Sequence, residues 1–257
     1  MQPAIAAAFI RQAHSCRHLG SAFHGTLCEL FAARLTLESA FAARIDAWPE
    51  SRAFADALPL RALGGLHALV RQGKVPALAA LYPPHAASED ALWAGVLDAV
   101  AAHDAFLTAF LDSPPQTNEV ARSSILLGCA QHLHARYGRA LAWWEIGASA
   151  GLNLGFPDYR YRLGVDTYNE DTPGAVEIHS RWEGNCPPLD VMLRVNERAG
   201  CDIAPLDPRT DRERLLSYVW PDQRERLART EAALDAAARA NWRVERAPAS
   251  AWLVRKL

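Results

Sequence analysis

The segment LAWWEIGASAGLNL, residues 141–154, constrains the fold of this chain more than any other. It opens with a short apolar run that ends in Glu145, and a turn made only of small residues follows between Gly147 and Gly151. Short apolar runs bounded by glycines are typical of buried strands, and glycine lets a backbone turn tightly and approach a neighbouring group closely. The segment therefore predicts a buried strand that leads into a tight turn, followed by a helix or a loop.

Residues 1–112 carry a different pattern, rich in alanine, leucine and arginine. Apolar residues recur there at helical spacing, for example at Leu27, Leu30 and Phe31, and no run alternates in the manner of a strand. Proline and glycine interrupt the pattern at intervals, and the helical run stops at the Ser-Pro-Pro of residues 113–115. We therefore expect an all-α helical domain over residues 1–112 and a second domain over residues 113–257.

The second domain alternates candidate strands with candidate helices. We expect an apolar helix over residues 120–136, ended by Gly138, and a β-hairpin insertion at about 156–184, where aromatic and basic residues alternate. Downstream, the pattern predicts a helix over 187–199, a strand over 200–205, helices over 211–220 and 221–239, a strand over 242–246 and a helix from 249.

This order of elements predicts an α/β fold. Consecutive strands joined by helices form a parallel sheet with right-handed crossovers. We therefore expect an N-terminal helical domain followed by a Rossmann-like parallel sheet with an inserted β-hairpin. The pattern contains three core strands, whereas doubly wound sheets commonly have about five or six, so we expect the sheet to be incomplete at residue 257.

Composition excludes several functional classes. The formal net charge of −2 provides no basic footprint for nucleic acid or anionic lipid, and no apolar run reaches the roughly 20 residues of a membrane span. The five cysteines contain no C-x-x-C pair, which favours free thiols in a cytoplasmic protein. His14 and His18 share a helix face but lack the glutamate of an H-E-x-x-H motif, so we expect no metal site. Nothing in the sequence indicates an oligomeric state.

The turn after the first strand has the composition that binding of a nucleoside requires. Gly147 and Gly151 allow a ligand to approach the backbone closely, and Ala148 and Ser149 keep the turn small. Glu145, at the end of the strand, is expected to hold an amino group of the ligand through water or a charge-assisted hydrogen bond. We therefore assign these five residues to a cofactor-binding site.

A second acid, Asp202, follows in the next predicted strand. A carboxylate at that place can hold both ribose hydroxyls of a nucleoside, although capping a helix or a turn explains the residue equally well. The spacing Gly147-x-x-x-Gly151 lacks the middle glycine of a dinucleotide fingerprint, and Glu145 would repel two phosphates. NAD and FAD are therefore disfavoured as ligands.

The same turn also contains Gly-x-Ser-x-Gly, the nucleophile elbow of serine hydrolases. Ser149 would then be the nucleophile, and an acid and a histidine should follow it along the chain. His179 is the only histidine after Ser149, and no acid at a strand end precedes it convincingly. A serine hydrolase therefore stays open as the third interpretation.

A polar segment, Gln116-Thr117-Asn118-Glu119, precedes the helix over residues 120–136. Thr117 can cap that helix, and Glu119 in its first turn suits the helix dipole. The amide and carboxylate groups of the segment can equally well face a ligand, because they come just before the strand and its turn. In that case Gln116 and Asn118 orient the substrate.

Several blocks of the sequence resemble a bacterial family known only as a domain of unknown function. They are PQTNE at residues 115–119, EIGASAGLNL at 145–154, YRY at 159–161 and VWPDQ at 219–223. The resemblance covers most of the chain. The C-terminal half is similar to class I S-adenosylmethionine-dependent methyltransferases, because Glu145-x-Gly147-x-x-x-Gly151 looks like their first motif.

The resemblance implies a methyltransferase-like protein that binds S-adenosylmethionine and acts on an unidentified small molecule. Asn153 then joins the cofactor site, Tyr159 and Arg160 join the substrate site, and Glu119 or Tyr161 removes a proton from the acceptor. No acid follows the third strand, in RAPAS, where methyltransferases often hold the adenine amino group. A non-catalytic ligand-binding or regulatory module on the same fold is therefore the alternative.

Overall fold

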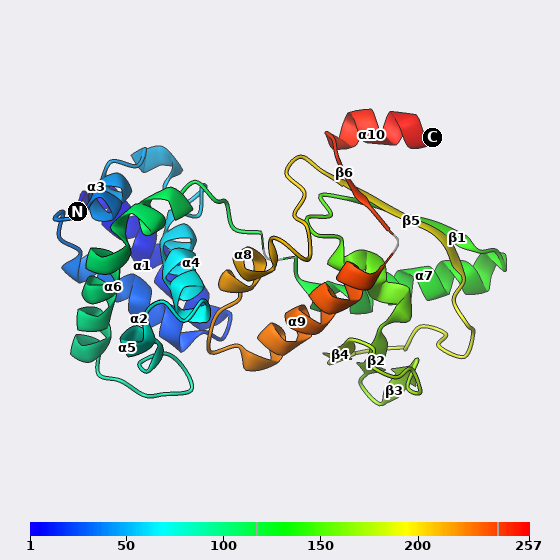
Figure 1. Ribbon diagram of the computed structural model, residues 1–257. Helices are drawn as coiled ribbons and strands as arrows, with labels where there is room; N and C mark the ends of the chain where they lie inside the picture. The colour runs from blue at the N-terminus through cyan, green and yellow to red at the C-terminus, as the bar shows by residue number, and fades with distance from the viewer. Residues whose placement is uncertain (117, 241) are drawn as a thin grey trace. The chain divides into compact units, whose positions relative to one another are not determined.

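A computed structural model of the protein describes residues 1–116, 118–240 and 242–257 (Figure 1). The chain forms two compact units. The helical unit comprises Met1–Thr117 and Glu213–Leu227, and the α/β unit comprises Asn118–Arg212 and Ala228–Leu257. A segment from the second half of the chain thus belongs to the helical unit, whereas the sequence pattern assigned all of residues 113–257 to one domain.

The described residues up to position 112 form only helices and their connections, as the sequence pattern predicts. Ser21, Ser39 and Ser88 each accept a hydrogen bond from a backbone N–H of the following turn, which fixes the N-termini of three helices. The elements of the helical unit are α1 (Pro3–His18), α2 (Ala22–Arg34), α3 (Ala40–Asp46), η1 (Glu50–Arg52), α4 (Leu58–Arg71), α5 (Pro76–Ala79), α6 (Glu89–Phe110), most of α8 (Arg212–Ser217) and the start of α9 (Arg224–Arg239).

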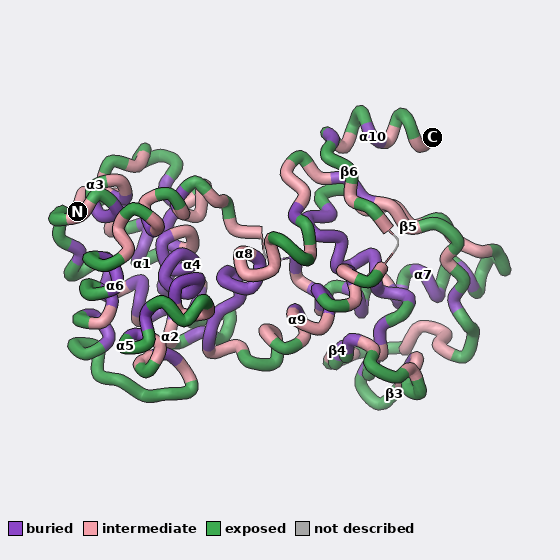
Figure 2. The backbone as a smooth tube through the Cα atoms, viewed as in Figure 1, coloured by how far each residue is buried: buried purple, intermediate pink, exposed green. Residues whose placement is uncertain are grey.

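Aromatic and aliphatic side chains build the core of this unit. Phe31 on α2 is fully buried, with its ring stacked on Phe9 at a centroid distance of 5.5 Å and edge-on to Trp93 at 5.3 Å. Leu27 and Leu30 are buried in the same cluster, as their helical spacing predicts. Figure 2 shows buried backbone along α1, α2 and α4. These ring contacts have the stacked and edge-on geometries that aromatic pairs prefer.

The α/β unit contains two small sheets. Strands β1 (Leu141–Ile146), β5 (Val195–Asp202) and β6 (Val244–Arg246) form a parallel sheet in the order β1-β5-β6. The second sheet has the order β3-β2-β4, in which β2 (Arg160–Leu163) and β3 (Asp166–Tyr168) are antiparallel and β4 (Glu177–Ser180) runs parallel to β2. The helical elements of the unit are η2 (Val120–Arg122), α7 (Ser123–Tyr137), η3 (Leu152–Asp158), the second part of α9 and α10 (Ala249–Lys256).

The mixed α/β fold and its parallel three-stranded sheet confirm the coarse expectation from the sequence. The helix before β1 ends at Gly138, which adopts a left-handed conformation, as expected. The inserted hairpin also exists, but it joins β2 to β3, and β4 adds to β2 in parallel. β4, near the end of the expected insertion, is therefore a third strand and not the second arm of the hairpin.

The helix expected over residues 187–199 is wrong. Residues from Val195 onward form β5, which pairs with β1 from Leu141 opposite Val195 to Ile146 opposite Cys201. The apolar spacing of this segment resembles that of a helix, but pairing with a neighbouring strand outweighs such a weak local preference. As a result, the second core strand begins five residues before the predicted position at Gly200.

Candidate functional site

The turn after β1 is tightly packed on one side and open on the other. Gly147, Ser149 and Gly151 all have left-handed backbone conformations, with φ of 67°, 52° and 72°. A Cβ atom on Gly200 of β5 would lie 2.7 Å from the Cβ of Ala148, so only glycine lets this strand pass so close to the turn. A Cβ atom on Gly147 would meet open space. The turn therefore offers a ligand free access at Gly147.

Asp202, the last residue of β5, holds the turn in place. Its Oδ2 accepts a hydrogen bond from the backbone N–H of Ser149 at 2.9 Å, and its Oδ1 accepts one from Ala204 at 2.8 Å. The fold thus brings the acid expected to bind ribose next to the glycine turn. Each carboxylate oxygen has a second lone pair, so Asp202 keeps acceptor capacity after ordering the turn.

Three polar side chains, those of Asn118, Glu145 and Asn153, form a cluster beside the turn. Asn118 donates from Nδ2 to the carbonyl of Ala148 at 3.1 Å, and Asn153 donates from Nδ2 to Oδ1 of Asn118 at 3.4 Å. The same Nδ2 lies 3.5 Å from Oε1 of Glu145. Within the described part of the chain, Glu145 Oε2 and Asn153 Oδ1 are buried and have no hydrogen-bond partner. The cluster therefore contains two acceptor oxygens that need a donor.

Burial raises the pKa of Glu145 to about 7. Loss of hydration disfavours the charged carboxylate, while the hydrogen bond from Asn153 and the positive charge of Arg122 oppose the shift. At neutral pH the carboxyl group is therefore close to half protonated. A ligand ammonium or hydroxyl group that donates to Oε2 would favour the charged form and satisfy the buried oxygen.

Tyr159 and Tyr161 were both predicted to belong to the site, and both have structural partners. The two side chains are buried, and their hydroxyls donate to the backbone carbonyls of Leu152 and Phe156. Burial raises the pKa of both hydroxyls above the usual value for tyrosine. The two phenols therefore stay protonated at neutral pH. Tyr161 ties β2 of the second sheet to η3, and Tyr159 closes η3 on itself.

Arg160 and Glu119 are held by ion pairs within the α/β unit. Arg160 lies in β2 and pairs with Glu177 of β4 at 2.7 Å. Glu119 accepts a hydrogen bond from the backbone of Ala121, which caps η2, and lies 3.5 Å from Arg229 of α9. Glu119 thus caps η2, whereas the sequence pattern placed it in the first turn of the following helix, with Thr117 as the cap.

Four further residues considered from the sequence come from different parts of the chain. Ser149 is 7% exposed in the turn after β1, whereas His179 is exposed on β4 beside Glu177. Gln116 is half-buried and belongs to the helical unit. Thr117, expected as a helix cap, lies outside the described residues.

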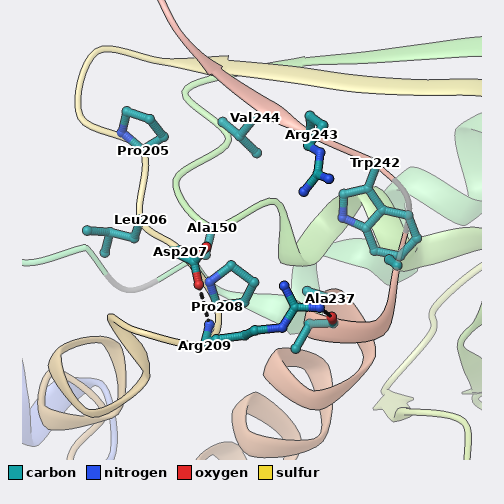
Figure 3. A pocket seen from close by; sticks show the side chains of 12 residues that line it. Ala150, Pro205, Leu206, Asp207, Pro208, Arg209, Ala237, Trp242, Arg243 and Val244 are labelled. Carbon is teal, nitrogen blue, oxygen red and sulfur yellow. Dashed lines mark hydrogen bonds between the residues drawn. The ribbon is translucent and has the colours of Figure 1, made fainter.

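A cavity of about 210 Å³ adjoins the turn, where Ala150 forms part of its wall (Figure 3). Its polar lining includes Asp207, Arg209 and Arg243, beside the Trp242 indole. Figure 3 shows the Arg243 guanidinium pointing toward the segment that carries Arg209. The sequence did not reveal these residues, because they come from three segments that are not adjacent along the chain. These are the segment after β5, the end of α9 and the start of β6.

The described residues contain no group of three or more histidine, cysteine, aspartate or glutamate side chains that could hold a metal ion. His14 and His18 lie exposed on α1. No helix within 1–116, 118–240 and 242–257 is long and apolar enough to span a membrane.

Comparison with known proteins assigns the chain to a family. Residues 6–257 match the family described as "Uncharacterized protein conserved in bacteria (DUF2332)", and the chain belongs to this family. No curated protein and no solved structure matches the chain. The expected membership in a bacterial family of unknown function is therefore confirmed.

Proposed function

We propose that this member of the family binds S-adenosylmethionine at the turn after β1 and catalyses methyl transfer to a small molecule. The main support is one structural combination: a parallel sheet in the order β1-β5-β6, a glycine turn after its first strand, and Asp202 at the end of its second. In open α/β sheets, ligands bind outside the carboxyl ends of the strands. The turn and Asp202 would hold the adenosine part of the cofactor there.

The side chains beside the turn fit the polar groups of such a cofactor. Glu145 Oε2 and Asn153 Oδ1 are buried acceptors with no partner among the residues that the structure describes. The methionine end of the cofactor carries an ammonium group with three donors. An unsatisfied buried acceptor costs about 1–3 kcal/mol, which a donating ligand would recover. The open space at Gly147 leaves room for the ligand to approach the backbone.

Methyl transfer requires mainly that the acceptor atom lies in line with the methyl group and the sulfur it leaves. An acceptor that must lose a proton also needs a base. Glu119 is our candidate for this role, because its carboxylate is half-buried within the α/β unit near Arg229. Tyr161 is the weaker candidate, because its hydroxyl donates to the carbonyl of Phe156.

The direct test is calorimetric titration of the full chain with S-adenosylmethionine and S-adenosylhomocysteine. We expect both to bind, and we expect Gly147→Ala to weaken binding at least about tenfold, because an added methyl group occupies space that the ligand needs. If neither compound bound, the proposal would be refuted.

Gly174→Ala is the matched control. Gly174 also has a left-handed backbone, with φ of 63°, and a Cβ atom there would also meet open space. The two variants therefore carry the same backbone strain but differ in location. Equal loss of affinity in both would mean that Gly147→Ala weakens binding by destabilising the fold and not by blocking the ligand.

A non-catalytic binding module is the alternative, and two observations favour it. Both carboxylate oxygens of Asp202 already accept backbone hydrogen bonds, and the strand end at Arg246-Ala247-Pro248 supplies no acid for an adenine amino group. This alternative predicts cofactor binding without transfer. Incubation with methyl-labelled S-adenosylmethionine and a set of small amines, thiols and phenols separates the two, because any labelled product excludes the alternative.

A further inference from the structure

The helical unit contains a cavity of its own, with a volume of about 210 Å³. Leu19, Leu60 and Pro115 form its apolar walls, together with the indole of Trp220. Four parts of the chain that are far apart in sequence supply these residues, and all of them belong to the helical unit. The turn after β1, where the cofactor is proposed to bind, belongs instead to the α/β unit.

The VWPDQ block, which the function proposed above does not use, builds one side of this cavity. Asp222 accepts hydrogen bonds from Ser21 Oγ at 2.6 Å and from the backbone N–H of Phe23 at 3.1 Å. Gln223 donates from Nε2 to the carbonyl of Leu19 at 2.9 Å. These bonds fix the block to the start of α2 and so hold Trp220 at the cavity wall.

Tyr218 forms another part of the wall, and a glycine makes room for its ring. A Cβ atom on Gly64 of α4 would lie only 2.6 Å from the ring of Tyr218, a distance that real structures essentially never show. The Tyr218 hydroxyl donates to the carbonyl of Ser113 at 2.7 Å, which fixes the far end of the side chain. The cavity thus has a preformed wall that does not depend on a ligand for its shape.

Two polar groups line the cavity in different ways. His24 is almost fully buried, its ring lies 5.6 Å from that of Trp220, and its Nδ1 has no hydrogen-bond partner among the described residues. Burial lowers the pKa of His24 well below its usual value, so the imidazole is neutral. Arg226 on α9 brings a guanidinium group, which also donates to Oε1 of Gln223 at 2.9 Å.

Three arginines lie at or near the cavity lining, while the Asp222 carboxylate in the same block accepts hydrogen bonds from Ser21 and Phe23. Arg61 and Arg214 both lie close enough to Tyr218 to favour its ionised form, although burial dominates and raises the pKa of this tyrosine to about 12. Arg226 adds a third positive charge at the lining itself. An anionic group is therefore favoured over a cationic one inside the cavity.

We propose that the helical unit binds a single-ring aromatic carboxylate in this cavity. An apolar cavity of about 150 Å³ is known to hold benzene, so a volume of 210 Å³ admits one ring with a short substituent. The ring packs against Trp220 and the aliphatic walls. The carboxylate pairs with Arg226, and the neutral imidazole of His24 provides a further polar contact.

The probe for this proposal is 4-fluorobenzoate, followed by fluorine NMR on the full chain. We expect line broadening and a saturable shift with a dissociation constant of about 1 mM or below, which is within reach of so small a ligand. We expect Arg226→Gln to weaken binding about tenfold, because a charge-assisted hydrogen bond is lost. Leu60→Trp should abolish binding by filling the cavity.

Two controls make the outcome decisive. Arg224→Gln removes an exposed arginine from the same helix and should leave the affinity unchanged. 4-Fluorobenzamide, which is neutral, should bind at least about fivefold more weakly than 4-fluorobenzoate. Equal affinity of the two probes, or an equal loss in Arg224→Gln and Arg226→Gln, would overturn the carboxylate assignment. Absence of binding by both probes would overturn the site, and neither result depends on S-adenosylmethionine.

Discussion

The two units bury ionisable side chains with opposite consequences. In the helical unit, burial lowers the pKa of His24 well below 6.5 and that of His67 to about 4. In the α/β unit, burial raises the pKa of Glu145 to about 7. The cause is the same in both units, because loss of water disfavours the charged form. The direction differs because histidine is charged when protonated and glutamate is charged when deprotonated.

The buried groups therefore make the two units respond to pH in opposite directions. Between pH 4 and 6.5 the unfolded chain binds a proton at His67 that the folded chain does not. The contribution of His67 to the free energy of unfolding is therefore complete above pH 6.5 and lost as the pH falls toward 4. Between pH 4.5 and 7 the folded chain binds the extra proton at Glu145. The contribution of Glu145 to the free energy of unfolding is therefore complete below pH 4.5 and lost as the pH rises through 7.

The largest expected effect concerns the core of the helical unit. Phe31→Ala removes a fully buried ring that contacts the rings of Phe9 and Trp93. We expect the free energy of unfolding to fall by about 4 kcal/mol, from lost burial and the cavity that remains. Urea denaturation measures the loss, and hydrogen exchange with mass spectrometry shows in which unit protection falls.

Ile125→Ala is the control for this variant. Ile125 lies on α7 of the α/β unit with 60% of its surface exposed, so the free energy of unfolding should change by less than about 0.5 kcal/mol. If Phe31→Ala cost no more than Ile125→Ala, the aromatic cluster would not be the core of the helical unit.

The next effect tests the opposite pH responses directly. Relative to Glu145→Gln, the wild-type protein should lose about 2 kcal/mol of stability between about pH 5.5 and 7.5, because its folded state must release a proton over that range. Denaturation curves at a series of pH values provide the measurement. The same slope in both proteins would show that Glu145 titrates normally.

His67→Asn provides the matching variant in the helical unit. Its side-chain amide can still donate to the carbonyl of Ser217, which accepts from Nδ1 of His67 at 3.1 Å in a neutral imidazole. The wild-type protein should lose stability relative to this variant as the pH falls from about 6.5 to 4.5, at up to about 1.4 kcal/mol per pH unit. A loss on raising the pH instead would contradict the contrast between the units.

The smallest effect concerns the buried tyrosines of the α/β unit. Tyr161→Phe removes one of two donors to the carbonyl of Phe156, which still accepts from the backbone N–H of Tyr159 at 3.4 Å; the lost hydrogen bond should cost about 1 kcal/mol of stability. Tyr137→Phe, at an exposed position on α7, should cost nothing measurable. If methyl transfer is detected and Tyr161→Phe abolishes it while the folded protein still binds the cofactor, the hydroxyl has a chemical role in addition to the structural one.

The parts of the fold that the sequence predicted depend on local patterns. Helical spacing identified buried positions such as Leu27 and Leu30, and the small residues after Glu145 identified the strand and its turn. The start of β5 was missed because strand pairing with β1, and not local preference, determines it. Contacts between distant segments have no local signature, and helix-like spacing in the segment before Gly200 therefore misled the prediction.

The candidate site shows the same limit. Asn118 and Asn153 were each selected for their chemistry, but the sequence did not indicate that Asn153 donates to Asn118 across 35 positions. The two unpartnered oxygens beside the turn emerge only from that packing. The cavities were invisible for the same reason, because each is assembled from segments that lie far apart along the chain.

The attachment of Asp222 to the start of α2 also bears on the order in which the protein can fold during synthesis. The bond from Ser21 to Asp222 joins residues 201 positions apart. Because a ribosome releases the chain from its N-terminus, most of the α/β unit is made before the helical unit can acquire its last segment. In a fragment that ends near residue 112, the start of α2 should therefore be incompletely capped. The cavity of the helical unit should lack the wall that Trp220 forms.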